Sequence, residues 1–152
     1  MQAYNKRSPT LGYVQGWNFI VARLLDVMSE EESFWCFAQI IESLMPLDYY
    51  SNLLGVMVDI KVFKALMKDN LPKLTSHLSK YFEVDLLLTK WLIYLFVNHL
   101  PMDAELAIWD LIMIRGVSVV FRVALTLFQL MQQDILAKND QGEIFMVIEE
   151  YK

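Results

Sequence analysis

Apolar residues recur along this chain at intervals of three and four, which is the spacing of an amphipathic α-helix. The clearest instance is one face with members at positions i, i+3, i+4, i+7 and i+11: Trp17, Ile20, Val21, Leu24 and Met28. No segment alternates apolar and polar residues between turn signals, so the pattern predicts no strand. The sequence therefore predicts an all-α fold, a multi-helix bundle without a β-sheet.

Turn and capping residues divide this pattern into successive helices. Ser29, with Glu32 three residues later, forms a capping-box pattern, and Pro46 ends the helix that it opens. Pro72 suits the first turn of a helix, Gly116 suits an αL cap and Ser118 an N-cap. The expected helices are 2–7, 15–28, 29–45, 55–70, 72–81, 85–96, 101–115, 118–138 and a short closing helix after the turn at 139–142, with 48–54 as a turn or further helix.

Two of these helices, 85–96 and 118–138, are apolar on most sides. A helix without a polar face belongs inside a bundle, so we expect others to surround both of them in layers. The 152 residues show no linker, low-complexity tract or internal repeat, which predicts a single domain.

The apolar content changes the picture, because hydrophobic residues make up 56% of the chain and charged residues only 20%. Typical globular chains have about 45–50% and about 25%. No apolar run reaches the ~18 residues of a membrane span, and no apolar h-region follows the N-terminus. The composition thus predicts no transmembrane segment, but more apolar surface than this core needs, which indicates a partner or missing sequence.

Charge and residue inventory exclude several function classes. The formal charge is −5, and no Lys/Arg cluster is present to neutralise a nucleic-acid backbone. A single cysteine, Cys36, excludes a disulfide framework or a cysteine zinc cage, and we expect it to be a buried core thiol. His77 and His99 are expected to pack or cap rather than bind metal, so no metal and no cofactor are predicted. Phosphate-loop, G-x-S-x-G and H-E-x-x-H motifs are absent.

One local segment is unusual. Gly12 and Gly16 bracket Tyr13 and Gln15 where a loop becomes a helix. Glycines at such a place let the backbone bend and let another surface approach closely. Spacing alone does not give Gln15 a special role, since a glutamine at a helix start is usually only solvated.

Residues 12–20, G-Y-V-Q-G-W-N-F-I, resemble the glutamine-finger motif of TBC domains, the GTPase-activating modules for Rab proteins. The resemblance covers roughly residues 3–136 and keeps the family's order and spacing. The residues that carry it further are 31–35, Tyr49, Tyr50, Met57, Asp59, Phe63, Pro72, Leu74, His77, Leu78, Trp91, Leu95, Phe96, Leu100, Pro101, Ile108, Trp109, Asp110, Gly116, Ala124 and Leu125.

The resemblance implies a regulator that completes the active site of another protein, a Rab-family small GTPase in its GTP-bound state. Gln15 would be the catalytic finger, because a carboxamide has an acceptor and two donors with which to hold the attacking water and touch the γ-phosphate. Tyr13, Gly16, Trp17 and Asn18 would be the partner-binding residues, Tyr13 and Asn18 by positioning the loop. The family also implies a role in vesicle trafficking and a cytoplasmic location with peripheral recruitment to endomembranes.

This chain departs from the family pattern in three places. TBC domains carry a second finger, an arginine in an upstream I-x-x-D-x-x-R motif, and no stretch of the 152 residues matches it. Trp17 stands where a methionine is common, and Ala107 where an arginine is usual, which indicates changes of packing or surface. We therefore expect residues 1–152 to be a single partial TBC domain that lacks its N-terminal helices and stimulates GTP hydrolysis weakly or not at all.

Two alternatives remain open at this point. The chain could be a non-catalytic TBC-like adaptor that binds a GTPase or scaffold without activating it, and an in-frame I-x-x-D-x-x-R in the upstream coding sequence would argue against that. It could also be an unrelated helical bundle with a central pocket for an apolar ligand, which predicts that Gln15 is buried inside the bundle.

Overall fold

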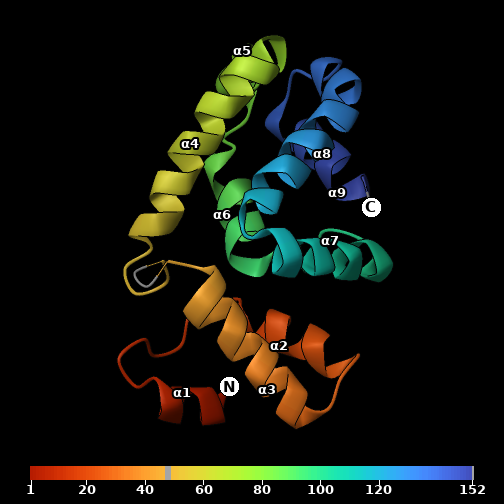
Figure 1. Ribbon diagram of the computed structural model, residues 1–152. Helices are drawn as coiled ribbons and strands as arrows, with labels where there is room; N and C mark the ends of the chain where they lie inside the picture. Colours follow the sequence, from red (N-terminus) through yellow and green to blue (C-terminus); the bar gives the residue numbers. More distant parts are fainter. Residues whose placement is uncertain (47–48, 152) are drawn as a thin grey trace.

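The computed structural model describes residues 1–46 and 49–151, and it contains no strand in that part of the chain. The elements, shown in Figure 1, are α1 (Gln2–Arg7), α2 (Trp17–Leu25), α3 (Glu30–Gln39), the π-helix η1 (Ile40–Leu44), α4 (Leu54–Asn70), α5 (Pro72–Tyr81), α6 (Asp85–Tyr94), α7 (Met102–Arg115), α8 (Ser118–Leu136) and α9 (Gln141–Glu150). The predicted all-α class is confirmed.

Helix α6 joins two groups of helices (Figure 1). In the first group, α3 packs against α1 and α2; in the second, α4 packs against α5, and α8 against α7 and α9. Helix α6 contacts α2 of the first group and both α4 and α8 of the second. Five of its ten side chains are buried: Leu87, Leu88, Trp91, Leu92 and Ile93. The start of α2 is therefore fixed against the centre of the molecule.

Helix α3 begins with the predicted capping box. The backbone N–H of Glu32 donates to the Ser29 hydroxyl at 3.4 Å, and the backbone N–H of Ser29 donates to the Glu32 carboxylate at 3.0 Å. The Ser29 hydroxyl, which donates to the Glu32 carboxylate at 2.7 Å, and then the Ser29 backbone N–H lower the pKa of Glu32. Since the pKa is lowered by folding, the stabilisation from this carboxylate is present above the ordinary glutamate pKa and lost as the pH falls through the folded-state value.

Replacing Ser29 with alanine is expected to lower the free energy of unfolding by about 1 kcal/mol, because the backbone N–H of Glu32 in the first turn of α3 loses its acceptor. The matched control is Ser118→Ala, since Ser118 is the first residue of α8 and makes no cap hydrogen bond, contrary to the sequence prediction. Urea unfolding at pH 7 measures both variants. Equal losses of stability for the two serines would contradict a capping role.

Helix α6 ends two residues earlier than the sequence pattern predicts. Leu95, Phe96 and Asn98 have φ values of 50°, 67° and 65°, in the left-handed region, so the chain turns after Tyr94. Such residues keep this conformation only where their surroundings hold it. No glycine marks the turn, and no other local signal predicts it. We call residues 95–98 the left-handed turn.

The apolar sequence of α8 predicts that other helices surround it, but the structure leaves part of the helix exposed. One face is buried, with Val119, Val120, Ala124, Phe128, Met131 and Ile135, while Leu130 on another face is 56% exposed. By length and composition alone α8 could cross a membrane, the one such helix among the residues described, but core helices of folded domains pass the same test. Val123 and Leu127 of α8 line a groove together with Ile108 of α7.

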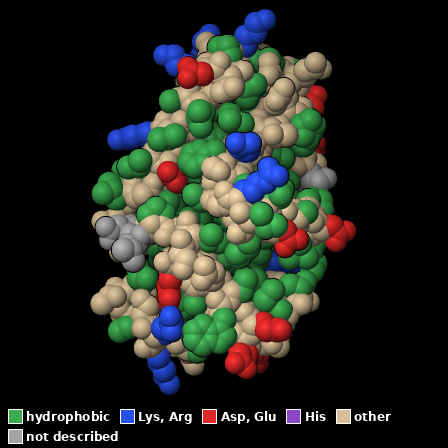
Figure 2. Space-filling model, in the orientation of Figure 1, with side chains coloured by type: hydrophobic (Ala, Val, Ile, Leu, Met, Phe, Trp, Pro, Cys, Tyr) green, Lys and Arg blue, Asp and Glu red, His purple; other side chains and the backbone are tan. Residues whose placement is uncertain are grey.

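Apolar surface remains exposed elsewhere too, consistent with the composition. Leu86 is 73% exposed and Ile114 78%. Figure 2 shows hydrophobic side chains spread between charged ones across one face of the molecule. The isolated cysteine lies at the edge of the core rather than within it: Cys36 is partly exposed, and burial raises the pKa of its thiol.

Local signals placed most other boundaries correctly. Pro72 opens α5, and α7 begins after Pro101 and ends at Arg115. Gly116 follows with a positive φ of 80°, although its ψ of 179° is extended rather than αL. Of the segment 48–54, Asp48 lies outside the described residues, while 49–53 form a turn rather than a helix. His77 approaches the carbonyl oxygen of Lys138 at 2.6 Å, in keeping with the packing or capping role expected.

Candidate functional site

Gln15 lies in the turn that leads into α2, and its side chain is exposed. The backbone around it is closed by two hydrogen bonds: Trp17 N–H donates to the Val14 carbonyl at 3.2 Å, and Phe19 N–H donates to the Gly16 carbonyl at 3.0 Å. The carboxamide therefore stands in solvent on a backbone that is held from within. We call residues 12–19 the Gln15 loop.

Tyr13 and Asn18 meet across the Gln15 loop. The Tyr13 hydroxyl donates a hydrogen bond to the Asn18 side-chain oxygen at 2.8 Å. Both residues are exposed, Tyr13 by 53%. This bond links the residues on either side of Gln15 and Gly16, so it limits how far the loop opens while leaving both side chains accessible to a partner.

Gly16 forms the underside of the loop. Its φ of 108° lies in the left-handed region, and a Cβ added there would overlap the ring of Tyr94. The same ring lies 5.4 Å from that of Phe19, centroid to centroid. Tyr94 comes from the end of α6, so a residue remote in sequence forms the floor on which the Gln15 loop rests. Gly12, also left-handed with a φ of 64°, faces open space.

Trp17 corrects the sequence prediction, because it is fully buried and cannot contact a partner directly. Its ring packs edge to face against Tyr4, Phe37 and Tyr50, at centroid distances of 5.7, 5.5 and 5.2 Å. Gly16 is buried as well. Both residues anchor the loop to the core instead of forming a partner-binding surface, which leaves Gln15, Tyr13 and Asn18 as the accessible members of the predicted site.

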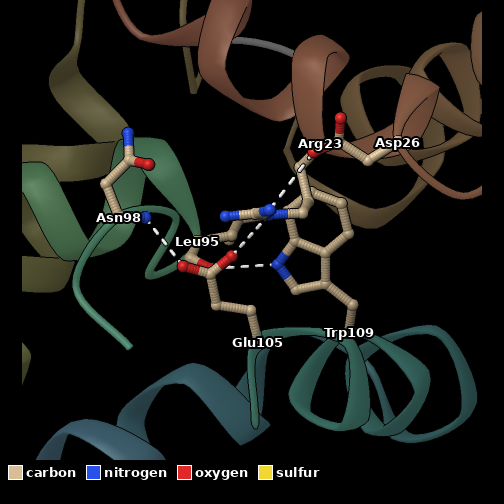
Figure 3. A network of polar contacts seen from close by, with 6 residues as sticks. All are labelled: Arg23, Asp26, Leu95, Asn98, Glu105 and Trp109. Atoms are coloured by element: carbon tan, nitrogen blue, oxygen red, sulfur yellow. Dashed lines mark hydrogen bonds and ion pairs between the residues drawn. The ribbon is translucent and has the colours of Figure 1, made fainter. Parts of the chain in front are cut away.

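A polar network joins α2, α7 and the left-handed turn around the buried carboxylate of Glu105 (Figure 3). The Glu105 carboxylate, with no exposed surface, accepts a hydrogen bond from Arg23 Nε at 2.7 Å and another from the backbone N–H of Asn98 at 2.7 Å. Arg23 also reaches Asp26 at 3.2 Å. Arg23 and Glu105 are 82 residues apart, so only the fold brings them together.

Arg7 lies near the motif in sequence but is already engaged. Its guanidinium donates two hydrogen bonds to the Glu42 carboxylate, at 2.8 and 2.9 Å, and lies 5.2 Å from the centre of the Trp35 ring. This pairing lowers the pKa of Glu42 and raises that of Arg7. Burial, followed by the nearby Glu42 charge, raises the pKa of Tyr4 to about 12. Arg7 therefore fixes α1 to η1.

Metal ligands do not gather in this region. Over residues 1–46 and 49–151, no three His, Cys, Asp or Glu side chains lie close enough to hold a metal ion. The Gln15 loop offers two exposed carboxamides, Gln15 and Asn18, and the Tyr13 hydroxyl, all of which accept and donate hydrogen bonds but carry no charge.

A family model described as the Rab-GTPase-TBC domain matches residues 1–136. The chain belongs to this family. The TBC fold is also evident in a solved structure, the RabGAP TBC domain of a Chlamydomonas flagellar protein, which is 29% identical and superposes with a TM-score of 0.89 over 98% of this chain and 50% of that one.

Curated TBC proteins resemble the chain more closely in sequence. TBC1 domain family member 2B of Xenopus tropicalis is 41% identical over 146 residues, and the human protein of that name is 40% identical. Growth hormone-regulated TBC protein 1 of Xenopus tropicalis is 37% identical over 145 residues. The chain spans 15% of the length of the first two relatives and 42% of the third.

Within this TBC chain, Tyr13, Gln15 and Asn18 of the predicted site are exposed, whereas the residues that support them were not predicted. Tyr94 lies on α6, which the sequence predicts to be a core helix, and Glu105 lies on α7. The one sequence signal for this network is a glutamate in an apolar helix. It indicates a cationic partner but does not identify the residue.

Proposed function

We propose that this chain is part of a GTPase activator for Rab-family small GTPases, and that Gln15 acts as its glutamine finger in the nucleotide pocket of a GTP-bound Rab. The observation that carries the proposal is the exposed Gln15 carboxamide on a loop whose backbone and flanking side chains are held by hydrogen bonds. The membership of the Rab-GTPase-TBC family supports the choice of partner.

The chemistry required of Gln15 is positioning. GTP hydrolysis needs a water held in line with the bond that breaks, and stabilisation of the charge on the transferring phosphoryl group. The Gln15 carbonyl oxygen would accept a hydrogen bond from the water while the amide N–H donates to a γ-phosphate oxygen. A loop held in one conformation before the partner arrives loses less entropy on forming this arrangement.

The second finger of TBC domains has no counterpart in these 152 residues, which contain no I-x-x-D-x-x-R. The two arginines nearest to Gln15 in sequence do not substitute for it, because Arg7 is paired with Glu42 and Arg23 with Glu105. Arginine fingers contribute about 10³–10⁵ in rate. Residues 1–152 are therefore expected to stimulate GTP hydrolysis far less than an activator with both fingers.

Single-turnover hydrolysis by a panel of GTP-loaded Rab proteins, with and without residues 1–152, tests this expectation. We expect residues 1–152 to stimulate GTP hydrolysis weakly in at least one Rab. They should bind that Rab more tightly when its GDP is accompanied by aluminium fluoride, because transition-state analogues bind more tightly than ground states. Stimulation by thousands-fold would contradict the role assigned to the missing arginine. Equal affinity with and without aluminium fluoride would contradict the catalytic role of Gln15.

A second candidate is a non-catalytic adaptor, which is favoured because Arg7 and Arg23 are both engaged in ion pairs and neither is free to act as a finger. An adaptor would bind GTP-loaded Rab without a further gain from aluminium fluoride, so the same experiment separates the two functions. The third alternative, a bundle that binds an apolar ligand around a buried Gln15, is contradicted because Gln15 is exposed.

A further inference from the structure

We propose that Glu105 is a positioning residue for Gln15: its buried carboxylate ties α2 to the left-handed turn and thereby keeps Tyr94 under Gly16. The inference rests on the proposed function of Gln15 only for its effect on hydrolysis. Its structural part, the fixing of the Gln15 loop by a distant carboxylate, stands on the contacts described below.

The two oxygens of Glu105 serve two different elements. Oε2 accepts from Arg23 Nε on α2, and Oε1 accepts from the backbone N–H of Asn98 in the left-handed turn, each at 2.7 Å. Neutralising the partly buried Arg23 requires only the first contact. The second contact fixes the distance between α2 and the turn, which is a geometric constraint rather than a charge balance.

Helix α7 holds the left-handed turn at both ends (Figure 3). Glu105 binds the N–H of Asn98, and Trp109, one helical turn later, donates its indole N–H to the Leu95 carbonyl at 2.9 Å. The positive φ values of the turn need such outside support, because non-glycine residues favour other conformations.

Tyr94 is the residue immediately before this turn. Its ring lies against Gly16 and Phe19, as described for the Gln15 loop. Arg23 lies on the helix that the loop opens. The same carboxylate therefore holds both α2 and the turn that follows Tyr94. A shift of Glu105 would move Tyr94 relative to α2.

A different result is expected if the pair between Arg23 and Glu105 serves only the stability of the fold. Replacing both partners of a buried pair with apolar residues of similar size is often neutral for stability, because the desolvation cost disappears with the charges. The double variant Arg23→Met/Glu105→Leu therefore separates folding from positioning. It should remain folded, yet lose the hydrogen bond to Asn98 and the fixed distance between α2 and the turn.

Amide hydrogen exchange and single-turnover hydrolysis form the test, using residues 1–152 and a responsive GTP-loaded Rab. For the double variant we expect exchange in residues 16–19 and 95–98 to accelerate about 10-fold or more, in line with a lower local opening free energy. We expect the maximal hydrolysis rate to fall while the half-saturating concentration stays unchanged, since a misplaced finger weakens the transition state more than binding. The matched control is Lys64→Met/Asp85→Leu, which removes an exposed ion pair between α4 and α6, and should change neither segment.

A second variant keeps the test decisive if the double variant does not fold. Trp109→Phe keeps an aromatic ring but removes the indole donor to Leu95, and it should accelerate exchange in the same two segments. A folded variant of either kind with wild-type exchange in residues 16–19 overturns the inference.

Gln15→Ala distinguishes this result from a failure of the proposed function. If Gln15→Ala lowers the hydrolysis rate, the Arg23/Glu105 changes should add nothing in its background; an additive loss would overturn the positioning role. If Gln15→Ala leaves hydrolysis unchanged, the proposed function fails, and hydrogen exchange alone still decides whether Glu105 fixes the loop.

Discussion

Replacing Gln15 with alanine is expected to return the GTP hydrolysis rate of the Rab partner to its intrinsic value. Removing one positioned group that stabilises developing charge costs about 10²–10³-fold in other active sites, which is enough to abolish all the stimulation expected here. The free energy of unfolding should change by less than about 0.5 kcal/mol, because the Gln15 side chain is exposed. Single-turnover hydrolysis and urea unfolding measure the two effects.

Further substitutions at the same position separate amide chemistry from bulk. Gln15→Asn keeps the carboxamide on a shorter side chain and should retain only part of the stimulation. Gln15→Glu keeps the length but places a carboxylate beside the γ-phosphate, where like charges repel, so stimulation should be lost. Gln129→Ala, at an exposed glutamine on α8, is the matched control. Full stimulation by Gln15→Ala or Gln15→Glu would show that Gln15 is not the finger.

Gly16→Ala is expected to lower the free energy of unfolding by about 2–5 kcal/mol. A left-handed conformation costs an L-residue about 1–2 kcal/mol, and Gly16 has a φ of 108°. The new methyl group would also overlap the Tyr94 ring, and overpacking of this kind costs about 1–3 kcal/mol. Urea unfolding measures the loss, and hydrolysis by the Rab partner should fall too, since the displaced ring or backbone moves Gln15.

Two variants separate these contributions. Gly12→Ala introduces a methyl group into open space at a φ of 64°, so it should show the conformational cost without the steric one. Tyr94→Ala should be less destabilising in the Gly16→Ala background than in the wild type, because the overlap disappears with the ring. Equal losses for Gly12→Ala and Gly16→Ala, together with additive losses for Gly16→Ala and Tyr94→Ala, would contradict the role of Tyr94 as the floor of the loop.

Trp17 illustrates how a motif residue can matter without touching a partner. The sequence placed it beside Gln15, and a partner contact was the natural interpretation. The structure instead buries its ring among three other aromatic side chains. Such edge-to-face contacts add to the stability gained from burial. Trp17 therefore fixes the first turn of α2, and with it Gln15, which precedes this turn.

Features encoded within a few residues were predictable from the sequence. The Ser29 capping box and the proline at the start of α5 act on neighbouring backbone groups, so their signals are local. The π-helix η1 and the left-handed turn after Tyr94 were not predicted. Neither carries a glycine, and the turn is held by hydrogen bonds from α7, which its own residues do not reveal.

The sequence by itself determined that the chain is helical, that Gln15 stands between two glycines at a helix start, and that no I-x-x-D-x-x-R motif accompanies it. Only the tertiary structure decided that Trp17 and Gly16 face inward, that Tyr94 lies beneath the loop, and that Glu105 holds Arg23 and Asn98. Periodicity and capping depend on neighbours in the chain, whereas these contacts join side chains that only the packing of α2, α6 and α7 brings within hydrogen-bonding distance.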